Sequence, residues 1–176
     1  MKRKKGFTLI EMIVALGVFL IAVLISTSSL LALTNAQRKA LIFQSTQDNL
    51  SFALETMTRD IRTGDSYHCA DDVSLVPTDC PSGNDTLTFQ NVAGLTVTYR
   101  ISEGRIFRSI NAGSTFDPVT SADVTIEQLI FYVLGSPTTD SLHPRVTIAL
   151  RGVSGSGTGR SELDLETTVS QRSIQR

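Results

Sequence analysis

Glu11 is the residue whose chemistry most needs an explanation, because it is the only acid in the apolar run 7–33. Four cations at residues 2–5, and then Gly6, precede that run. A carboxylate in a membrane helix costs roughly 2.5–3.5 kcal/mol near the bilayer centre, and less near the interface. We therefore expect Glu11 to have a partner that offsets this cost.

Two partners for Glu11 are compatible with the sequence. Thr8 and Glu11 have the T-x-x-E spacing of a capping box, in which the acid accepts a hydrogen bond from a free backbone N–H at the start of a helix. Alternatively, cleavage between Gly6 and Phe7 would create a free amine on Phe7, four positions before Glu11. The amine of a neighbouring copy could then pair with Glu11 inside the apolar layer and set the axial register between packed helices.

Cys69 and Cys80 are the only cysteines, and they lie in a segment rich in Asp, Ser, Pro and Thr. Two cysteines outside the cytoplasm favour a disulfide. The neighbouring side chains that could ligate a metal ion are His68, Asp71, Asp72 and Asp79. No C-x-x-C pair accompanies them, so a disulfide is favoured over free thiols and over a metal site.

Residues for catalysis are few and scattered. His68 and His143 have no Ser or Cys partner in a recognised nucleophile motif. The Gly-rich segment 152–159 lacks the Lys-Ser/Thr of a phosphate loop, so it is expected to be a hairpin connection. We predict neither enzymatic activity nor a cofactor.

The charge balance does not indicate nucleic-acid binding. The chain has 16 Lys and Arg against 17 Asp and Glu, and it has no Trp. Without residues 2–5, twelve cations would face seventeen acids, a net charge of −5. A mildly acidic chain with scattered Arg has no basic footprint for DNA or RNA.

The apolar run 7–33 is long enough to span a membrane. Its 27 residues would extend about 40 Å as a helix, and about 20 residues suffice to cross the hydrocarbon core. The cations at 2–5 predict a cytoplasmic N-terminus, with residues 35–176 on the other side. A secretory signal peptide fits less well, because its apolar stretch is only about 7–15 residues long.

A helical pattern continues beyond this run. Residues 35–63 contain no Pro or Gly, and Gly64 with preceding Arg59 and Arg62 is typical of a helix end. The apolar positions expected to form one buried stripe are Ala36, Ala40, Phe43, Leu50, Leu54, Met57 and Ile61. The stripe is too short for an independent coiled coil, so we expect it to be covered by another layer.

Short alternating segments after the helix predict that layer. The expected strands are 86–89, 95–101, 105–110, 124–134, 145–151 and 162–169. Turns are expected at 91–94 and at 102–104, the latter a three-residue hairpin connection. The predicted fold class is therefore α+β, with one long N-terminal helix packed on a C-terminal antiparallel β-sheet.

The segment from Lys4 to Leu16 resembles the class III leader of type IV pilins and type II secretion pseudopilins. The resemblance implies that a membrane prepilin peptidase cuts after Gly6 and N-methylates Phe7. It also implies that Glu11 is the acid that directs assembly. Major pilins have a helix-breaking proline where this chain has Ser28, which argues against a major pilin, and residues 26–29 are expected to loosen the helix instead.

The segment Asn49–Arg62 resembles the helix end of W-type minor pilins and J-type pseudopilins, which contain a form of F-A-L-x-x-(L/M)-x-R-D-I-R. The resemblance implies a scarce subunit at the filament tip that primes assembly.

These observations predict four segments. They are a leader at 1–6, a transmembrane helix at 7–33, its amphipathic continuation at 34–64, and an extracytoplasmic β domain at 65–176 with disulfide loop 69–80. The expected partners are the prepilin peptidase, other pilin or pseudopilin subunits through the helix, the inner-membrane assembly platform, and the bilayer before assembly. The alternative is a signal-anchored surface protein with a ligand-binding β domain that never polymerises.

Overall fold

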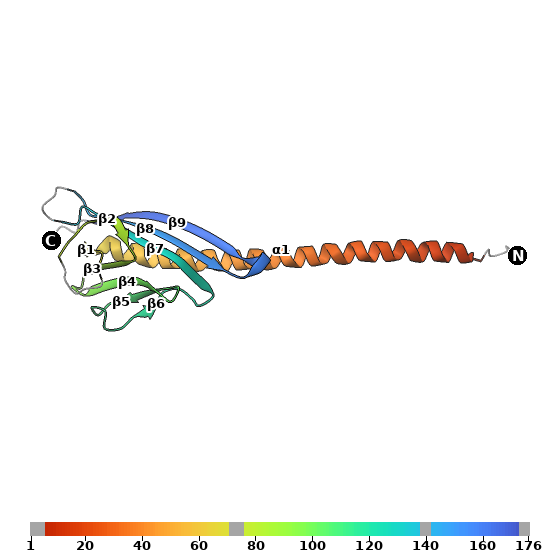
Figure 1. Ribbon diagram of the computed structural model, residues 1–176, viewed down its shortest axis with the longest axis horizontal. Helices are drawn as coiled ribbons and strands as arrows, with labels where there is room; N and C mark the ends of the chain where they lie inside the picture. The colour runs from red at the N-terminus through yellow and green to blue at the C-terminus, as the bar shows by residue number, and fades with distance from the viewer. Residues whose placement is uncertain (1–5, 71–75, 138–141, 173–176) are drawn as a thin grey trace. The chain divides into compact units, whose positions relative to one another are not determined.

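The computed structural model describes residues 6–70, 76–137 and 142–172. It has two compact units, residues 1–40 and 41–176, and helix α1 (Leu9–Thr63) contributes to both (Figure 1). The helix predicted at 7–33 and continued at 34–64 is therefore present as one element, without its first two residues and its last one. Residues 2–5 of the expected leader lie outside the described residues, as do Asp71 and Asp72.

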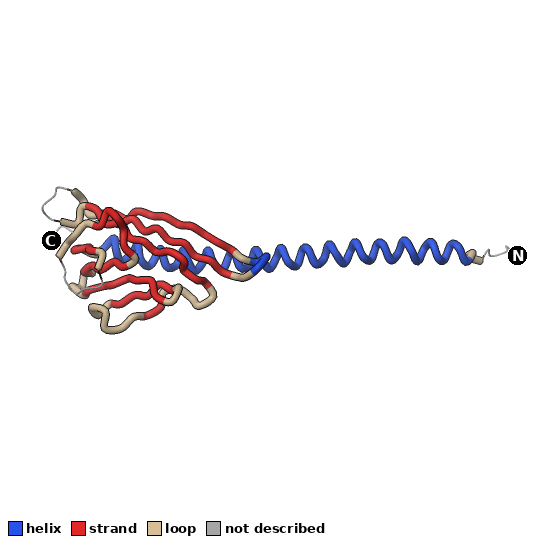
Figure 2. The backbone as a smooth tube through the Cα atoms, viewed as in Figure 1, coloured by secondary structure: helices blue, strands red, loops and turns tan. Residues whose placement is uncertain are grey.

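The second unit contains two antiparallel sheets beside helix residues 41–63 (Figure 2). The first has the order β1-β3-β4-β5-β6. Its strands are β1 (Asp65–His68), β3 (Thr86–Gln90), β4 (Thr96–Ser102), β5 (Arg105–Ser109) and β6 (Asp117–Pro118). The second has the order β2-β7-β8-β9. Its elements are β2 (Cys80–Asn84), β7 (Val124–Leu134), β8 (Arg145–Ser154) and β9 (Ser161–Ser170), with a 3₁₀ turn, η1 (Gly157–Gly159), between β8 and β9.

One hydrophobic core joins the helix to both sheets. The buried helix residues are Thr46, Leu50, Ala53, Met57 and Ile61. The largest side chains that the sheets bury completely include Tyr67, Phe89, Tyr99 and Phe131. The α+β class is confirmed, but the expected single sheet is divided in two, and β7 contacts β3, β4 and β5 across the division.

The predicted helix stripe is correct at Leu50, Met57 and Ile61, and Leu54 is half-buried. It is wrong at Ala36, Ala40 and Phe43, which are exposed. The covering layer of the second unit ends at the β8–β9 connection, where a Cβ built on Gly155 would lie 3.3 Å from the side chain of Ile42. Ala36, Ala40 and Phe43 keep the helical spacing, but no strand among the described residues buries them.

Gly64 ends the helix at the predicted place, for a different reason. A Cβ at this position would lie 2.5 Å from the ring of Phe89. The glycine therefore permits a close approach between the helix end and β3. The left-handed conformation that glycine often supplies at a helix end is adopted nearby by Ser66, whose φ is 57°.

All six predicted strands are present, with ends shifted by at most three residues. The expected three-residue connection at 102–104 is a two-residue turn, in which both Glu103 (φ 49°) and Gly104 (φ 68°) have the positive φ of a type I′ hairpin. The expected connection at 152–159 is shorter, because β8 continues to Ser154. Gly152 lies within the strand because the side chain of Leu50 packs against it.

Strands β1, β2 and β6 were not predicted. Each lies at an edge of its sheet or is only two residues long. β2 has the sequence CPSGN, whose Pro, Gly and Asn are poor strand formers. Pro81 is tolerated there because β2 is an edge strand.

Candidate functional site: the N-terminal helix

The start of helix α1 is capped by Thr8. Its Oγ1 accepts a hydrogen bond from the backbone N–H of Glu11 at 3.3 Å, and its carbonyl accepts from the N–H of Met12 at 3.2 Å. This is the Thr8 half of the predicted capping box. A capped first turn gives the side chain of Glu11 a defined position, one turn into the helix.

The first unit is a helix with an apolar surface. Its large hydrophobic side chains from Phe7 to Leu33 are between 43% and 79% exposed. Within the described residues, α1 is the one helix long and apolar enough to cross a membrane. An isolated soluble helix would be strongly disfavoured with such a surface, whereas lipid or neighbouring apolar helices would cover it.

Four hydroxyl side chains lie within this apolar segment, at residues 26–29. Each donates to the carbonyl four residues earlier, over 2.5–3.0 Å. The expected loosening of the helix at Ser28 is therefore wrong, because α1 is continuous there. Internal bonding of this kind satisfies hydroxyl groups that lipid cannot hydrogen-bond.

Residues 1–27 match the family model of the prokaryotic N-terminal methylation motif. This segment supports a type IV pilin-like N-terminus. The matched segment contains Gly6, Phe7, Thr8 and Glu11. Proteins with this motif are structural rather than enzymatic, and the motif implies processing by a prepilin peptidase and assembly with other pilins. No curated protein and no solved structure matches the chain.

The two cysteines of the second unit are joined. Cys69 and Cys80 form a disulfide with a Cα–Cα distance of 6.2 Å. Cys69 follows β1 of the first sheet and Cys80 begins β2 of the second, so the bond links the two sheets. Asn84 donates its side-chain amide to the carbonyl of Cys69 at 3.0 Å, close to the same junction.

The residues considered as metal ligands have other surroundings. His68 is buried, with Nδ1 3.4 Å from the carbonyl of Ser66. Asp79 accepts a hydrogen bond from the N–H of Ser136 at 2.8 Å. His143, which was considered only for catalysis, is exposed just before β8. Among the residues that the structure describes, no three His, Cys, Asp or Glu side chains lie together as a metal site.

Removing the disulfide should destabilise the second unit. We expect Cys69→Ser with Cys80→Ser to lower the free energy of unfolding by about 2–3 kcal/mol, because the unfolded chain loses a loop constraint. The measurement is urea unfolding of the full chain in detergent. Reduced wild type should show the same loss, and an unchanged midpoint in both samples would contradict the structural role of this bond.

Asp60 attaches the helix to the first sheet. The R-D-I-R pattern in the sequence includes this residue, but the sequence did not predict which side chains it contacts. Its Oδ2 accepts a hydrogen bond from the hydroxyl of Tyr99 at 2.7 Å and pairs with the guanidinium of Arg108 at 2.8 Å. Tyr99 and Arg108 are directly opposite each other on β4 and β5. Burial and the bond to Asp60 raise the pKa of Tyr99 well above its usual range. The acid of the R-D-I-R segment therefore fastens the helix end to the first sheet.

Replacing Asp60 should loosen this attachment. We expect Asp60→Ala to cost about 1–3 kcal/mol of stability, because the half-buried Arg108 loses its counter-charge and Tyr99 its acceptor. Asp48→Ala, an exposed acid on the same helix, should change stability by less than about 0.5 kcal/mol. Unfolding in urea compares the two variants, and equal stabilities would show that Asp60 is not an anchor.

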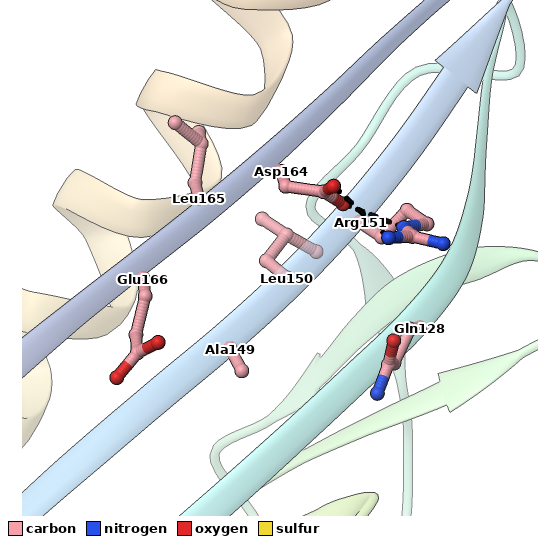
Figure 3. A pocket seen from close by; sticks show the side chains of 7 residues that line it. All are labelled: Gln128, Ala149, Leu150, Arg151, Asp164, Leu165 and Glu166. Atoms are coloured by element: carbon pink, nitrogen blue, oxygen red, sulfur yellow. Dashed lines mark hydrogen bonds and ion pairs between the residues drawn. The ribbon is translucent and has the colours of Figure 1, made fainter.

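The outer face of the second sheet contains a hollow of about 250 Å³ (Figure 3). It is lined by Gln128, Ala149, Leu150, Arg151, Asp164, Leu165 and Glu166. Arg151 donates to both carboxylate oxygens of Asp164, at 2.6 and 3.0 Å. This pair lowers the pKa of Asp164 and raises that of Arg151. The lining contains the carboxylates of Asp164 and Glu166 but no Ser, Cys, His or Lys.

Proposed function

We propose that this protein is a minor pilin or pseudopilin, a structural subunit of a type IV pilus, competence or type II secretion filament. The observation that carries the proposal is the methylation motif at 1–27, placed directly on a capped helix with an apolar exposed surface. In this role the peptidase cuts between Gly6 and Phe7, and Phe7 becomes the methylated N-terminus.

Glu11 acts in assembly. Cleavage leaves an amine on Phe7, and the amine of one copy pairs with Glu11 of a neighbouring subunit within the apolar layer. A charge pair shielded from water is favourable only when both members are present. Each subunit therefore enters the filament at one axial position.

The chain is anchored in the cytoplasmic membrane before assembly, with its N-terminus in the cytoplasm and residues 35–176 outside. The cations at 2–5 support this orientation. The disulfide supports it as well, since such bonds persist in extracytoplasmic compartments. Its partners are the prepilin peptidase, the inner-membrane assembly platform, lipid before assembly, and other subunits through α1.

A priming position at the filament tip is the more specific part of the proposal. The segment Asn49–Arg62 resembles W-type minor pilins and J-type pseudopilins, and Ser28 stands where major pilins have proline. The continuous hydrogen-bonded helix at 26–29 is consistent with a subunit that differs from a major pilin in this region.

Intact-mass analysis of the protein purified from its native membrane tests the proposal. We expect the mass of residues 7–176 with an intact disulfide and one added methyl group. The mass of the uncut chain would overturn it and favour a signal-anchored surface protein that does not polymerise.

A further inference from the structure

We propose that the free edge of β9 binds an extended segment of a partner protein in which basic and apolar residues alternate. The interaction is β-strand addition, in which main-chain hydrogen bonds supply affinity and alternate side chains supply selectivity. It goes beyond the filament role and does not depend on leader cleavage.

The edge of β9 is unusually regular. β9 is the last strand of its sheet, and its ten residues pair with β8 from Ser161 to Ser170 without a register shift. Its sequence, SELDLETTVS, contains no Pro or Lys. Charged side chains, proline, bulges and shortness normally protect an edge strand from pairing. Of these, β9 has only charged side chains, the acids Glu162, Asp164 and Glu166, which would repel a strand of like charge.

The other three edges have such protection. β1 has four residues and β6 has two. β2 contains Pro81 and has an irregular register with β7. Among the described strands, β9 is therefore the edge best suited to receive another strand.

The side chains of β9 specify what the incoming strand should carry. On its outer face, Glu162, Asp164 and Glu166 are exposed at alternate positions. On its inner face, Leu163 and Leu165 pack against the core but remain only half-buried. A strand added at this edge would complete the burial of the leucines with its apolar residues, and its basic residues would lie beside the acids.

The hollow on the outer face supports a long basic side chain at one of these positions. Glu166 lies directly opposite Ala149, whose small side chain leaves the space open (Figure 3). Arg151 is held by Asp164, and its other acid contact is with Glu162 at 3.7 Å. A Lys or Arg from the partner would meet Glu166 on β9, and the open space beyond it over Ala149 leaves room for the end of a long side chain. A second copy of β9 is disfavoured, because its acids would face these acids.

The test uses the full chain in lipid nanodiscs and a capped eight-residue peptide of alternating Val and Lys. We expect the peptide to bind and to slow amide hydrogen exchange in β9. Glu162→Lys with Glu166→Lys should weaken binding by tenfold or more. The control is Glu103→Lys with Asp123→Lys, which makes the same change in charge at two exposed turn residues outside β9. This control should leave binding unchanged.

Two further peptides separate strand addition from simple charge attraction. A peptide of alternating Val and Glu should not bind. Two Val-Lys peptides, N-methylated at one or the other alternate set of backbone nitrogens, retain the charge, and at least one should lose tenfold or more in affinity. The proposal would be overturned if both N-methylated peptides bound as tightly as the unmethylated peptide, if the β9 variant bound as tightly as wild type, or if exchange in β9 were unchanged. Exchange in β8 reports whether the variant remains folded.

Discussion

An aspartate in place of Gly6 should leave the leader attached to nearly every copy of the protein. A Cβ at Gly6 would meet no atom of this chain within 4 Å, so the substitution has no steric reason to disturb the fold. The loss would arise in the peptidase, where a charged side chain must enter a subsite suited to glycine. Burying an unpaired charge costs several kcal/mol, so we expect cleavage to fall by about 100-fold or more.

The measurement is the ratio of cut to uncut chain by mass spectrometry of membrane extracts. Gly17→Ala is the matched control, because a Cβ at Gly17 also meets no atom within 4 Å and this position lies away from the cleavage site. Efficient cutting of the Gly6 variant at the same bond would contradict the proposal that a prepilin peptidase processes this chain.

Glu11→Gln should nearly abolish incorporation into filaments while leaving cleavage intact. The substitution removes the negative charge and leaves the Phe7 amine of a neighbouring copy without its partner in the apolar layer. Breaking a buried ion pair costs about 3–5 kcal/mol, which lowers incorporation on the order of 100-fold to 1,000-fold. Immunoblotting of sheared filaments against membrane fractions measures the ratio, and Glu11→Ala should behave in the same way.

Glutamine also distinguishes the two explanations of Glu11. Glu and Gln both serve in a capping box, so Glu11→Gln would assemble normally if capping were the whole role of this residue. Thr8→Val removes the cap itself, for which we expect a cost of only about 1 kcal/mol in helix stability. Normal assembly of Glu11→Gln would contradict the ion-pair proposal.

Patterns of neighbouring residues were enough to predict the long helix and the long strands. Helix α1 could be located because an apolar run and then a helical spacing of apolar residues follow one another from 9 to 63, interrupted by no proline. β7 was predicted at its exact bounds because eleven residues alternate or run apolar between turn-forming segments. The motif at 1–27 likewise consists of adjacent residues, so it can be recognised in the sequence without knowledge of the fold.

Contacts between distant residues decided the rest. β2 is a strand because β7 offers it hydrogen bonds, although Pro81 and Gly83 disfavour that state locally. Asp60 has an anchoring role only because Tyr99 and Arg108 come together on neighbouring strands. The sequence by itself determined the long apolar helix, its methylation motif and the positions of the main strands along the chain, since these depend on neighbouring residues. Only the tertiary structure decided the division into two sheets, the partners of Asp60 and the exposure of the β9 edge, because each depends on which surfaces are covered.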